Sequence, residues 1–470
     1  MLPTRLSKTE IYDALSSLHD KDISWRDGKA WAYVYDPGKE TEIVGKTAYV
    51  DFLSENALDF TAFPSVLKME QEIVAIMANH ASGDEDTVGN FTSGGTESII
   101  LAVKAARDKY STGGWIPEII LPATGHASFW KAAHLLGCRV VPVPVDSVSF
   151  KAIPEEVEKA ITANTIMIVG SAVSYAHGVL DPIAALASIA AENDIWMHVD
   201  ACIGGFVLPF FKRFGGTEEA WDFAVPGVSS ISIDLHKYAF CPKGASVLLF
   251  KDRELRRHEL YACASWTGYG VVNSTLQSSK SGGPVAASWA VLHHLGDEGY
   301  EKLFLSCWDS TKKLVEGIQK ISGLEIMGEP DSNLIAFSST EEGNINIFEV
   351  ADLLNEKGWF VQVQLRFENS KENIHLSVNP KAEGWVESFL QDLGKAVQEA
   401  AQSFDLPFLG VSPEELEEMD FSGEMFDSLL GMVGVSGTSI SKQMAPINGL
   451  LNVLPPSLRE KILIEFVNRF

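Results

Sequence analysis

Helical and strand patterns alternate along most of the first 300 residues, and this alternation limits the folds open to the chain. VLKMEQEIVAIMANHA places Val66, Ile73 and Met77 near one face of a helix, and EIILPA is a short apolar run typical of a buried strand. The strand patterns CRVVPVPV, TIMIVGSA, IWMHVDA and ASVLLF follow, with helices predicted over SFWKAAHLLG and IAALASIAAEN. Strands and helices in this alternation build a parallel or mixed sheet covered by helices. We therefore expect an α/β fold.

The pattern changes after residue 300. A long helix over KLFLSCWDSTKKLVEGIQKIS precedes the strands LEIMG and NLIAFSS, a helix over IFEVADLLNEKG, and the strands WFVQVQL and NIHLSV. A compact unit of roughly 100 residues is large enough for a small domain. We predict an N-terminal segment at 1–60, a large domain at 61–300, a small C-terminal α+β domain at 301–405 and a helical extension at 406–470. Within the extension, LLGMVGVSG and ILIEFVNRF indicate packing or interface material.

Charge and cysteine content exclude several classes of partner. The net charge of −26 would repel nucleic acid and anionic membrane surfaces alike. No stretch approaches the roughly 18 uninterrupted apolar residues that a membrane span needs. Five scattered cysteines without a CxxC pair suggest neither a disulfide framework nor a metal site. We expect a protein of the reducing cytoplasm with a small-molecule substrate.

A glycine-rich segment, TSGGTES, opens the helix SIILAVKAA. Gly94 and Gly95 permit close approach of a ligand to the backbone, while Ser93 and Thr96 add hydroxyl groups beside the free N–H groups of the helix start. This combination predicts a phosphate cradle. The alternative interpretation is a glycine turn with a threonine helix cap.

Two further segments bring polar side chains to the ends of predicted elements. His126 precedes the helix SFWKAAHLLG, where an imidazole can lie flat against a heteroaromatic ring. Asp200 ends the apolar strand IWMHVD, where a carboxylate needs a cation or a protonated ring nitrogen as its partner. A solvated histidine and a carboxylate that caps the following glycine turn are the structural alternatives.

Lys237 follows a third such strand in the segment SSISIDLHKYAFCPKG. A lone lysine most often extends to solvent. In a crevice between strand ends, desolvation would instead lower the pKa of its amine and let it form an imine with an aldehyde. The cradle, the stacking histidine, the carboxylate and the lysine together fit one cofactor, pyridoxal 5'-phosphate.

In this order and spacing, SGGTES, HASFWKAA, HVDACIGGF and SISIDLHKYAFCPKGASVLLF resemble the group II decarboxylase family of fold-type I pyridoxal-phosphate enzymes, and within it most of all the sphingosine-1-phosphate lyases. The resemblance covers roughly residues 45 to 400. It implies an aspartate aminotransferase-like fold, with a large mixed- or parallel-sheet domain and a smaller C-terminal α+β domain. It also implies a homodimer with the active site at the subunit boundary.

The resemblance assigns roles residue by residue. Lys237 would bind the cofactor covalently, Asp200 would partner its ring nitrogen, and His126 would stack on the ring. The remaining cofactor contacts would come from Ser93, Gly94, Gly95, Thr96, Ser174 and His236, and from Gly282 of the neighbouring subunit. Tyr49 and Lys243 match positions that handle the substrate, and Tyr49, Lys243 and His126 are alternative bases for a β-hydroxyl proton.

Two departures from the lyase pattern concern the substrate. Asp59, in NALDF, replaces a histidine that helps to bind substrate phosphate, and a carboxylate there would repel a phosphate. Lys280, in SKSG, replaces an arginine and loses its two-pronged hydrogen bonding.

The residues favour a carbon–carbon lyase that cleaves an amine, which is either phosphorylated or not, by retro-aldol chemistry. Alpha-decarboxylation of an L-amino acid is the alternative. An aminotransferase, with Arg366 holding the substrate carboxylate, and a non-catalytic homologue are weaker alternatives.

Overall fold

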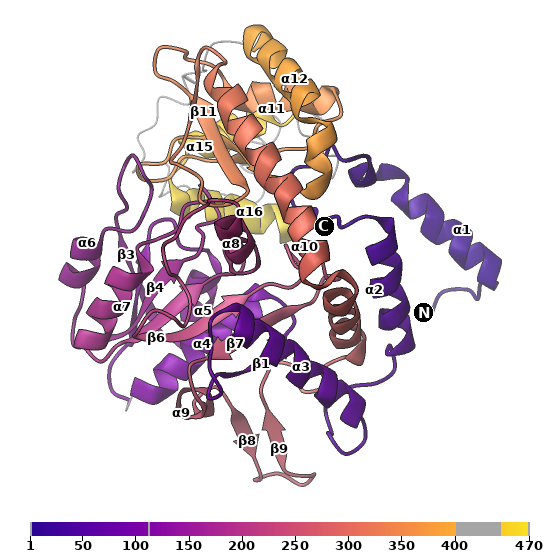
Figure 1. The fold of residues 1–470 in the computed structure, drawn as a ribbon, viewed down its shortest axis with the longest axis vertical. Helices are drawn as coiled ribbons and strands as arrows, with labels where there is room; N and C mark the ends of the chain where they lie inside the picture. The colour runs from indigo at the N-terminus through magenta and orange to yellow at the C-terminus, as the bar shows by residue number, and fades with distance from the viewer. Residues whose placement is uncertain (1, 111–112, 401–442, 469–470) are drawn as a thin grey trace.

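A mixed seven-stranded sheet forms the centre of the molecule (Figure 1). The computed structural model describes residues 2–110, 113–400 and 443–468. The strand order is β1-β7-β6-β5-β4-β2-β3, in which β7 runs antiparallel to both of its neighbours and the other pairs are parallel. The strands are β1 (Val88–Thr92), β2 (Glu118–Pro122), β3 (Arg139–Val143), β4 (Thr165–Ser171), β5 (Trp196–Asp200), β6 (Val228–Ile233) and β7 (Ser246–Phe250). The predicted α/β fold with a mixed sheet is confirmed.

Helices cover both faces of this sheet because its strands are apolar on both sides, as buried parallel strands require. One buried cluster joins the sheet to α4 and α5, and another joins it to α3, α7, α8 and α10. The helices are α3 (Pro64–His80), α4 (Gly95–Tyr110), α5 (Ser128–Leu136), α6 (Pro154–Lys159), α7 (Ile183–Glu192), α8 (Gly204–Arg213), α9 (Arg253–Arg257) and α10 (Gly282–Gln319). The carboxyl ends of the parallel strands consequently meet at one edge of a buried sheet.

A smaller antiparallel sheet, with the order β10-β11-β13-β12, follows α10. Its elements are β10 (Leu324–Ile326), β11 (Leu334–Ser339), α11 (Ile347–Glu356), β12 (Gln362–Gln364), β13 (Asn373–Ser377), η3 (Pro380–Gly384) and α12 (Val386–Glu399). The chain of α10 breaks its helical geometry at Gly296, whose φ is 55°. The C-terminal half of α10 packs through Leu314 and Ile318 on the core of this smaller unit. The boundary predicted near residue 300 stays a prediction.

The N-terminal segment contributes to the small-domain core, which the sequence did not indicate. Trp31 is fully buried, and its ring centroid lies 4.4 Å from that of Phe389 and 5.4 Å from that of Trp359. Its backbone N–H donates to Phe360 and its carbonyl accepts from Ser377. The segment from the N terminus therefore completes a core whose other members lie some 300 residues later.

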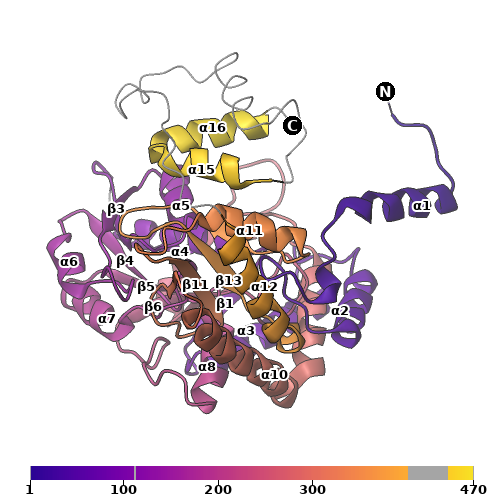
Figure 2. The ribbon, with the colours of Figure 1, turned by 90° about the horizontal axis from the view of Figure 1, so that it is seen from above.

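Several elements lie outside these two layers. Figures 1 and 2 show α1 (Lys8–Leu18) projecting from the body. Figure 1 shows the separate hairpin of β8 (Tyr261–Cys263) and β9 (Val271–Asn273) at the bottom of the view. Figure 2 shows α15 beside α11, on the small-domain side, with α16 beyond α15. The remaining elements are η1 (His19–Lys21), η2 (Trp25–Asp27), α2 (Lys39–Asp51), α15 (Ala445–Val453) and α16 (Pro456–Asn468).

Part of the predicted extension, including LLGMVGVSG, lies outside the described residues. Among the residues that are described, no helix has the length and apolar character needed to cross a bilayer.

Candidate active site

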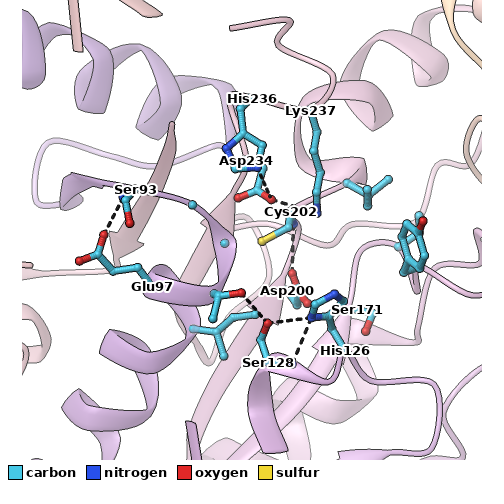
Figure 3. A pocket seen from close by; sticks show the side chains of 17 residues that line it. Ser93, Glu97, His126, Ser128, Ser171, Asp200, Cys202, Asp234, His236 and Lys237 are labelled. Atoms are coloured by element: carbon cyan, nitrogen blue, oxygen red, sulfur yellow. Dashed lines mark hydrogen bonds and ion pairs between the residues drawn. The ribbon is translucent and has the colours of Figure 1, made fainter. Parts of the chain in front are cut away.

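A cavity of about 390 Å³ lies where β5 and β6 end and α4 begins (Figure 3). Eight of the ten residues predicted to contact the cofactor line it: Ser93, Gly94, Gly95, Thr96, His126, Asp200, His236 and Lys237. Its other lining residues are Glu97, Ile99, Ser128, Ser171, Val173, Tyr175, Cys202, Ile203 and Asp234. The four segments singled out in the sequence thus meet at one place.

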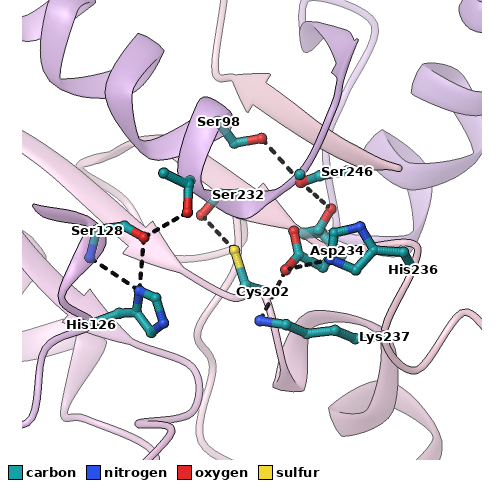
Figure 4. Close-up of polar contacts among 12 residues, drawn as sticks. Ser98, His126, Ser128, Cys202, Ser232, Asp234, His236, Lys237 and Ser246 are labelled. Carbon is teal, nitrogen blue, oxygen red and sulfur yellow. Dashed lines mark hydrogen bonds and ion pairs between the residues drawn. The ribbon is translucent and has the colours of Figure 1, made fainter. Parts of the chain in front are cut away.

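Lys237 forms an ion pair inside this cavity. Its Nζ lies 2.9 Å from Oδ2 of Asp234, a carboxylate that is 2% exposed (Figure 4). Burial by itself lowers the pKa of Lys237, but the charge and hydrogen bond of Asp234, together with nearby Cys202 and Tyr35, outweigh burial, so that the pKa lies above its ordinary value. The same pair holds the pKa of Asp234 below its ordinary value in spite of burial. Desolvation therefore acts in the predicted direction, but the net shift in the pKa of Lys237 is upward, because Asp234 places a counter-charge beside the amine.

Asp200 ends β5 beside the strand that leads to Lys237. Its Oδ1 accepts hydrogen bonds from the backbone N–H of Cys202 at 3.1 Å and from the hydroxyl of Ser232 at 3.5 Å. Ser232 lies directly opposite Asp200 in the register of β5 and β6. Both contacts orient the carboxylate, which is 7% exposed and lines the cavity. A buried carboxylate with few donors is well suited to hold a positively charged group of a ligand.

His126 is held by the start of α5. Its Nδ1 accepts from the backbone N–H of Ser128 at 3.2 Å and lies 2.9 Å from the hydroxyl of the same residue. Burial lowers the pKa of His126, although Asp200 opposes the shift. The imidazole is therefore neutral near pH 7, with its proton on Nε2. The ring packs edge-on against Tyr175, with centroids 6.4 Å apart.

The glycines at the start of α4 leave space in the cavity that the side chain of any other residue at these positions would occupy. A Cβ on Gly95 would come within 2.8 Å of both Asp234 and Cys202, and a Cβ on Gly94 would lie 3.1 Å from His236. Gly94 also has a φ of +152°, a backbone conformation that other residues rarely adopt. The first helical hydrogen bond runs from Ser98 to Gly94, so the N–H groups between them lack helical acceptors. These residues fit the phosphate of pyridoxal phosphate.

Five predicted residues lie outside the cavity lining, and three of them are Ser174, Gly282 and Tyr49. Ser174 sits between two lining residues, but its buried hydroxyl has no partner among the described residues. Gly282 begins α10, where its N–H donates to Glu55. Tyr49 lies beside it, because a Cβ on Gly283 would come within 3.1 Å of the Tyr49 ring.

Lys243 lines a second cavity of about 390 Å³, which shares His236 with the first. Its Nζ lies 4.6 Å from the ring centroid of Tyr35 and 3.4 Å from the carbonyl oxygen of His236. Burial, assisted by the charge of Lys237, lowers the pKa of Lys243 to about 8. Lys243 therefore lies close to the cofactor cavity but in a different compartment.

Asp59 and Lys280, the two residues that differ from the lyase pattern, each interact with a nearby side chain. The Asp59 carboxylate accepts from the backbone N–H of Thr61 at 2.8 Å and from its hydroxyl at 2.6 Å, and the side chain is exposed. Lys280 forms a largely buried ion pair with Glu70. The aminotransferase hypothesis finds no support at this site: Arg366 pairs with Glu372 and is absent from the cavity lining.

Sequence reasoning missed Asp234, Cys202 and Tyr175. A signal existed for Asp234, because it follows β6 as Asp200 ends the neighbouring β5, and it stands three residues before the lysine. Tyr175 comes from the loop after β4, and no pattern in the sequence indicates that this loop reaches His126.

The fold and this cavity together define an enzyme of fold type I that uses pyridoxal phosphate as its cofactor. The family model described as "Pyridoxal-dependent decarboxylase conserved domain" matches residues 46–340, and the chain belongs to this family of lyases. A second model, "Pyridoxal-dependent enzyme, C-terminal putative HTH domain", matches residues 396–469.

Individual relatives support this assignment. The chain is 38% identical to the sphingosine-1-phosphate lyase of Dictyostelium discoideum over 415 residues, which cover 88% of this chain and 77% of that protein. It is 34% identical over 322 residues to a probable L-tyrosine/L-aspartate decarboxylase of Methanothermobacter thermautotrophicus, with 68% and 85% of the two chains covered. The solved structure of a sphingosine-1-phosphate lyase from Burkholderia pseudomallei has a TM-score of 0.80 and 35% identity, and the match covers 85% of this chain and 92% of that one.

Proposed function

We propose that this enzyme cleaves the bond between the alpha and beta carbons of an amphiphilic amine that carries a phosphate, as in sphingosine-1-phosphate. The similarity to sphingosine-1-phosphate lyases over most of both chains carries this proposal. The cavity supports it with a lysine, a second carboxylate and a glycine cradle in one enclosed space.

Pyridoxal phosphate supplies an electron sink for the bond that breaks, when its ring nitrogen is protonated. Lys237 would hold it covalently, and Asp234 would keep the lysine amine oriented in the cavity. The carboxylate of Asp200 would stabilise the proton on the ring nitrogen, because an opposite charge favours the protonated form. Ser93, Gly94, Gly95, Thr96 and His236 would bind the phosphate.

His126 would orient the substrate rather than remove its proton. Its Nδ1 already accepts a hydrogen bond from Ser128, so the Nε2–H is the group available to donate. Tyr49 and Lys243 remain candidates for the base that takes the β-hydroxyl proton. The pKa of Lys243, which burial lowers to about 8, suits proton transfer near neutral pH.

Alpha-decarboxylation is the alternative, favoured by the Methanothermobacter relative. The two reactions release different products, so one assay separates them. Purified enzyme with added cofactor is incubated with phosphorylated long-chain bases and with L-amino acids, and long-chain aldehyde and carbon dioxide are measured. Aldehyde release supports the proposal, carbon dioxide release supports the alternative, and neither product from any substrate contradicts both.

The proposal includes a homodimer whose two active sites are shared between subunits. Tyr49 and Gly282 lie together at the start of α10 and outside their own chain's cavity, which fits residues that serve the neighbouring site. We further propose a cytoplasmic enzyme without nucleic-acid partners, since all five cysteines are free thiols and the net charge is −26.

Subunit complementation tests the shared site. Lys237→Ala and Tyr49→Phe chains, each expected to be inactive or weak alone, are co-expressed and the mixed dimer is purified through two different tags. A shared site restores activity in one of the two sites of the mixed dimer. Activity no greater than the mean of the parent variants would mean that each chain uses its own Tyr49.

A further inference from the structure

Tyr175 forms part of the cavity wall and has no assigned role. Its hydroxyl donates to Oε1 of Gln362, and its ring stacks on His375 with centroids 4.6 Å apart and planes inclined by 29°. Burial raises the pKa of Tyr175 above its ordinary range, so the hydroxyl keeps its proton and acts as the donor. Both contacts come from the small domain, whereas Tyr175 belongs to a loop of the large one.

The two partners of Tyr175 lie directly opposite each other. Gln362 on β12 and His375 on β13 form a register pair of the antiparallel sheet. His375 is fully buried, its Nδ1 lies 3.4 Å from the carbonyl oxygen of Ala176, and its Nε2 lies 3.2 Å from the hydroxyl of Ser377. Burial lowers the pKa of His375 to about 4, so the ring is neutral. One pair of strands therefore holds Tyr175 by its hydroxyl and by its ring.

The connection between β12 and β13 makes a second contact with the same loop. The hydroxyl of Ser370 lies 3.0 Å from Nε2 of His177, two residues after Tyr175. The ring of His177 stacks on Phe150 with centroids 4.0 Å apart. The loop that carries Tyr175 is thus fixed at the tyrosine and at the two residues that follow it by this strand pair and its connection.

The C-terminal helices hold this connection from its other side. Asn452 of α15 accepts from the backbone N–H of Arg366 at 2.7 Å and donates to the carboxylate of Glu372 at 3.2 Å. Arg459 of α16 donates to the carbonyl oxygen of Arg366 at 3.0 Å. Asn452 is 6% exposed, so its two hydrogen bonds are partly shielded from water, whereas that of Arg459 is exposed. Both ends of the connection are attached to the C-terminal helices.

We propose that Gln362 and His375 are positioning residues for Tyr175, and that α15 and α16 serve the active site by fixing the strand pair that carries them. The proposal rests on the lyase function argued above. It gives the C-terminal helices a task within the enzyme itself. Tyr175 would present its ring to His126 in the orientation that this strand pair imposes.

A double-mutant cycle on the full-length enzyme with cofactor tests the proposal. Gln362→Leu is expected to lower kcat about five-fold, the effect of one lost hydrogen bond, with little change in KM. In a Tyr175→Phe background the same change should have no further effect, because the hydroxyl that Gln362 accepts from is gone. Effects that add in the double variant would overturn the proposal.

Matched variants separate positioning from general damage. Gln364 lies two residues along β12 and has no polar side-chain contact among the described residues, so Gln364→Leu should leave kcat unchanged. Gln362→Glu keeps the acceptor oxygen and should retain most of the activity. For the helices, Asn452→Ala should lower kcat about three-fold and should not add to Gln362→Leu, whereas Asn448→Ala on the same helix should be silent. A loss in Gln364→Leu equal to that in Gln362→Leu would contradict the positioning role.

A spectroscopic readout keeps this test independent of the substrate. Tyr175 and Lys237 line the same cavity, and the ring of Tyr175 packs edge-on against His126, so the orientation of the Tyr175 hydroxyl affects the polarity around the lysine-bound cofactor. Gln362→Leu should therefore shift the pH midpoint of the absorbance of the lysine-bound cofactor, and the shift should vanish in Tyr175→Phe. If the pH midpoint shifts but no amine is turned over, the lyase function alone is contradicted. If the pH midpoint does not change in Gln362→Leu, the positioning role is contradicted.

Discussion

The cofactor residues and the substrate residues occupy contrasting parts of the molecule. Eight of the ten predicted cofactor residues line one cavity, where Lys237, Asp200 and the glycine cradle face each other. The three predicted substrate residues lie elsewhere: Tyr49 beside the start of α10, Asp59 in an exposed turn and Lys243 in the second cavity. The cofactor residues come from strand ends and helix starts of one sheet, and the sheet alone brings them together. The substrate residues come from segments outside that sheet.

The largest expected effect is that of removing the cofactor-binding amine. Lys237→Ala should lower kcat at least about 10³-fold, as expected for loss of a covalent catalytic residue, and should abolish the visible band that borohydride removes. Lys251→Ala removes a lysine that pairs with Asp84 near the surface, and it should keep both activity and band. An unchanged spectrum in Lys237→Ala would place the covalent link on another residue.

The second-largest fall in kcat is expected when the charge of the Asp200 carboxylate is removed. Asp200→Asn keeps the size of the side chain but loses its charge, and kcat should fall about 10²- to 10³-fold, the range for one preorganised electrostatic contact. Asp200→Glu retains the charge and should recover part of the rate. Steady-state kinetics at saturating cofactor measure both variants, and full activity of Asp200→Asn would remove the ring-nitrogen role.

Lys243 tests the substrate side through its pKa. Because burial lowers this pKa to about 8, the amine is charged below that pH and loses its charge as the pH rises through it. If it binds the substrate phosphate, KM for a phosphorylated amine should rise above pH 8, while KM for the unphosphorylated amine stays flat. Lys243→Ala should raise KM about ten-fold or more at pH 7, the value of one charged hydrogen bond. Equal pH profiles for the two amines would separate Lys243 from the phosphate.

The smallest effect is expected at Asp59. Its carboxylate binds Thr61 within its own exposed turn, where solvent screens the charge. Asp59→Asn keeps the acceptor oxygen and should change KM for a phosphorylated amine by less than about two-fold. A ten-fold fall in KM would mean that Asp59 faces the substrate phosphate. At least one predicted substrate residue would then act beside the cofactor residues instead of apart from them.

Much of the fold and of the cofactor site could be predicted, because both rest on local patterns. Apolar runs and glycine positions mark β5, β6 and the start of α4, and parallel strands necessarily bring their carboxyl ends to one edge. Asp200, Lys237 and Gly94 were therefore predictable as neighbours.

The rest depends on contacts between distant segments. Asp234 raises the pKa of Lys237 against the effect of burial, and the direction of its carboxylate relative to the lysine is not encoded in their spacing. Trp31 joins Trp359 in the small-domain core, and Tyr175 meets Gln362, although no periodic pattern links either pair. The first contact follows from the way the N-terminal segment joins the small-domain core, and the second from the way the loop after β4 meets the small sheet.

The most direct measurement is to map the covalent attachment itself. The enzyme with bound cofactor is reduced with borohydride, digested, and each lysine-containing peptide is weighed by mass spectrometry. We expect the cofactor mass on the peptide containing Lys237 and on no other. The cofactor mass on the peptide containing Lys280 would contradict the central claim. Fragmentation of the peptide that assigns the cofactor mass to Lys243 instead of Lys237 would contradict it as well.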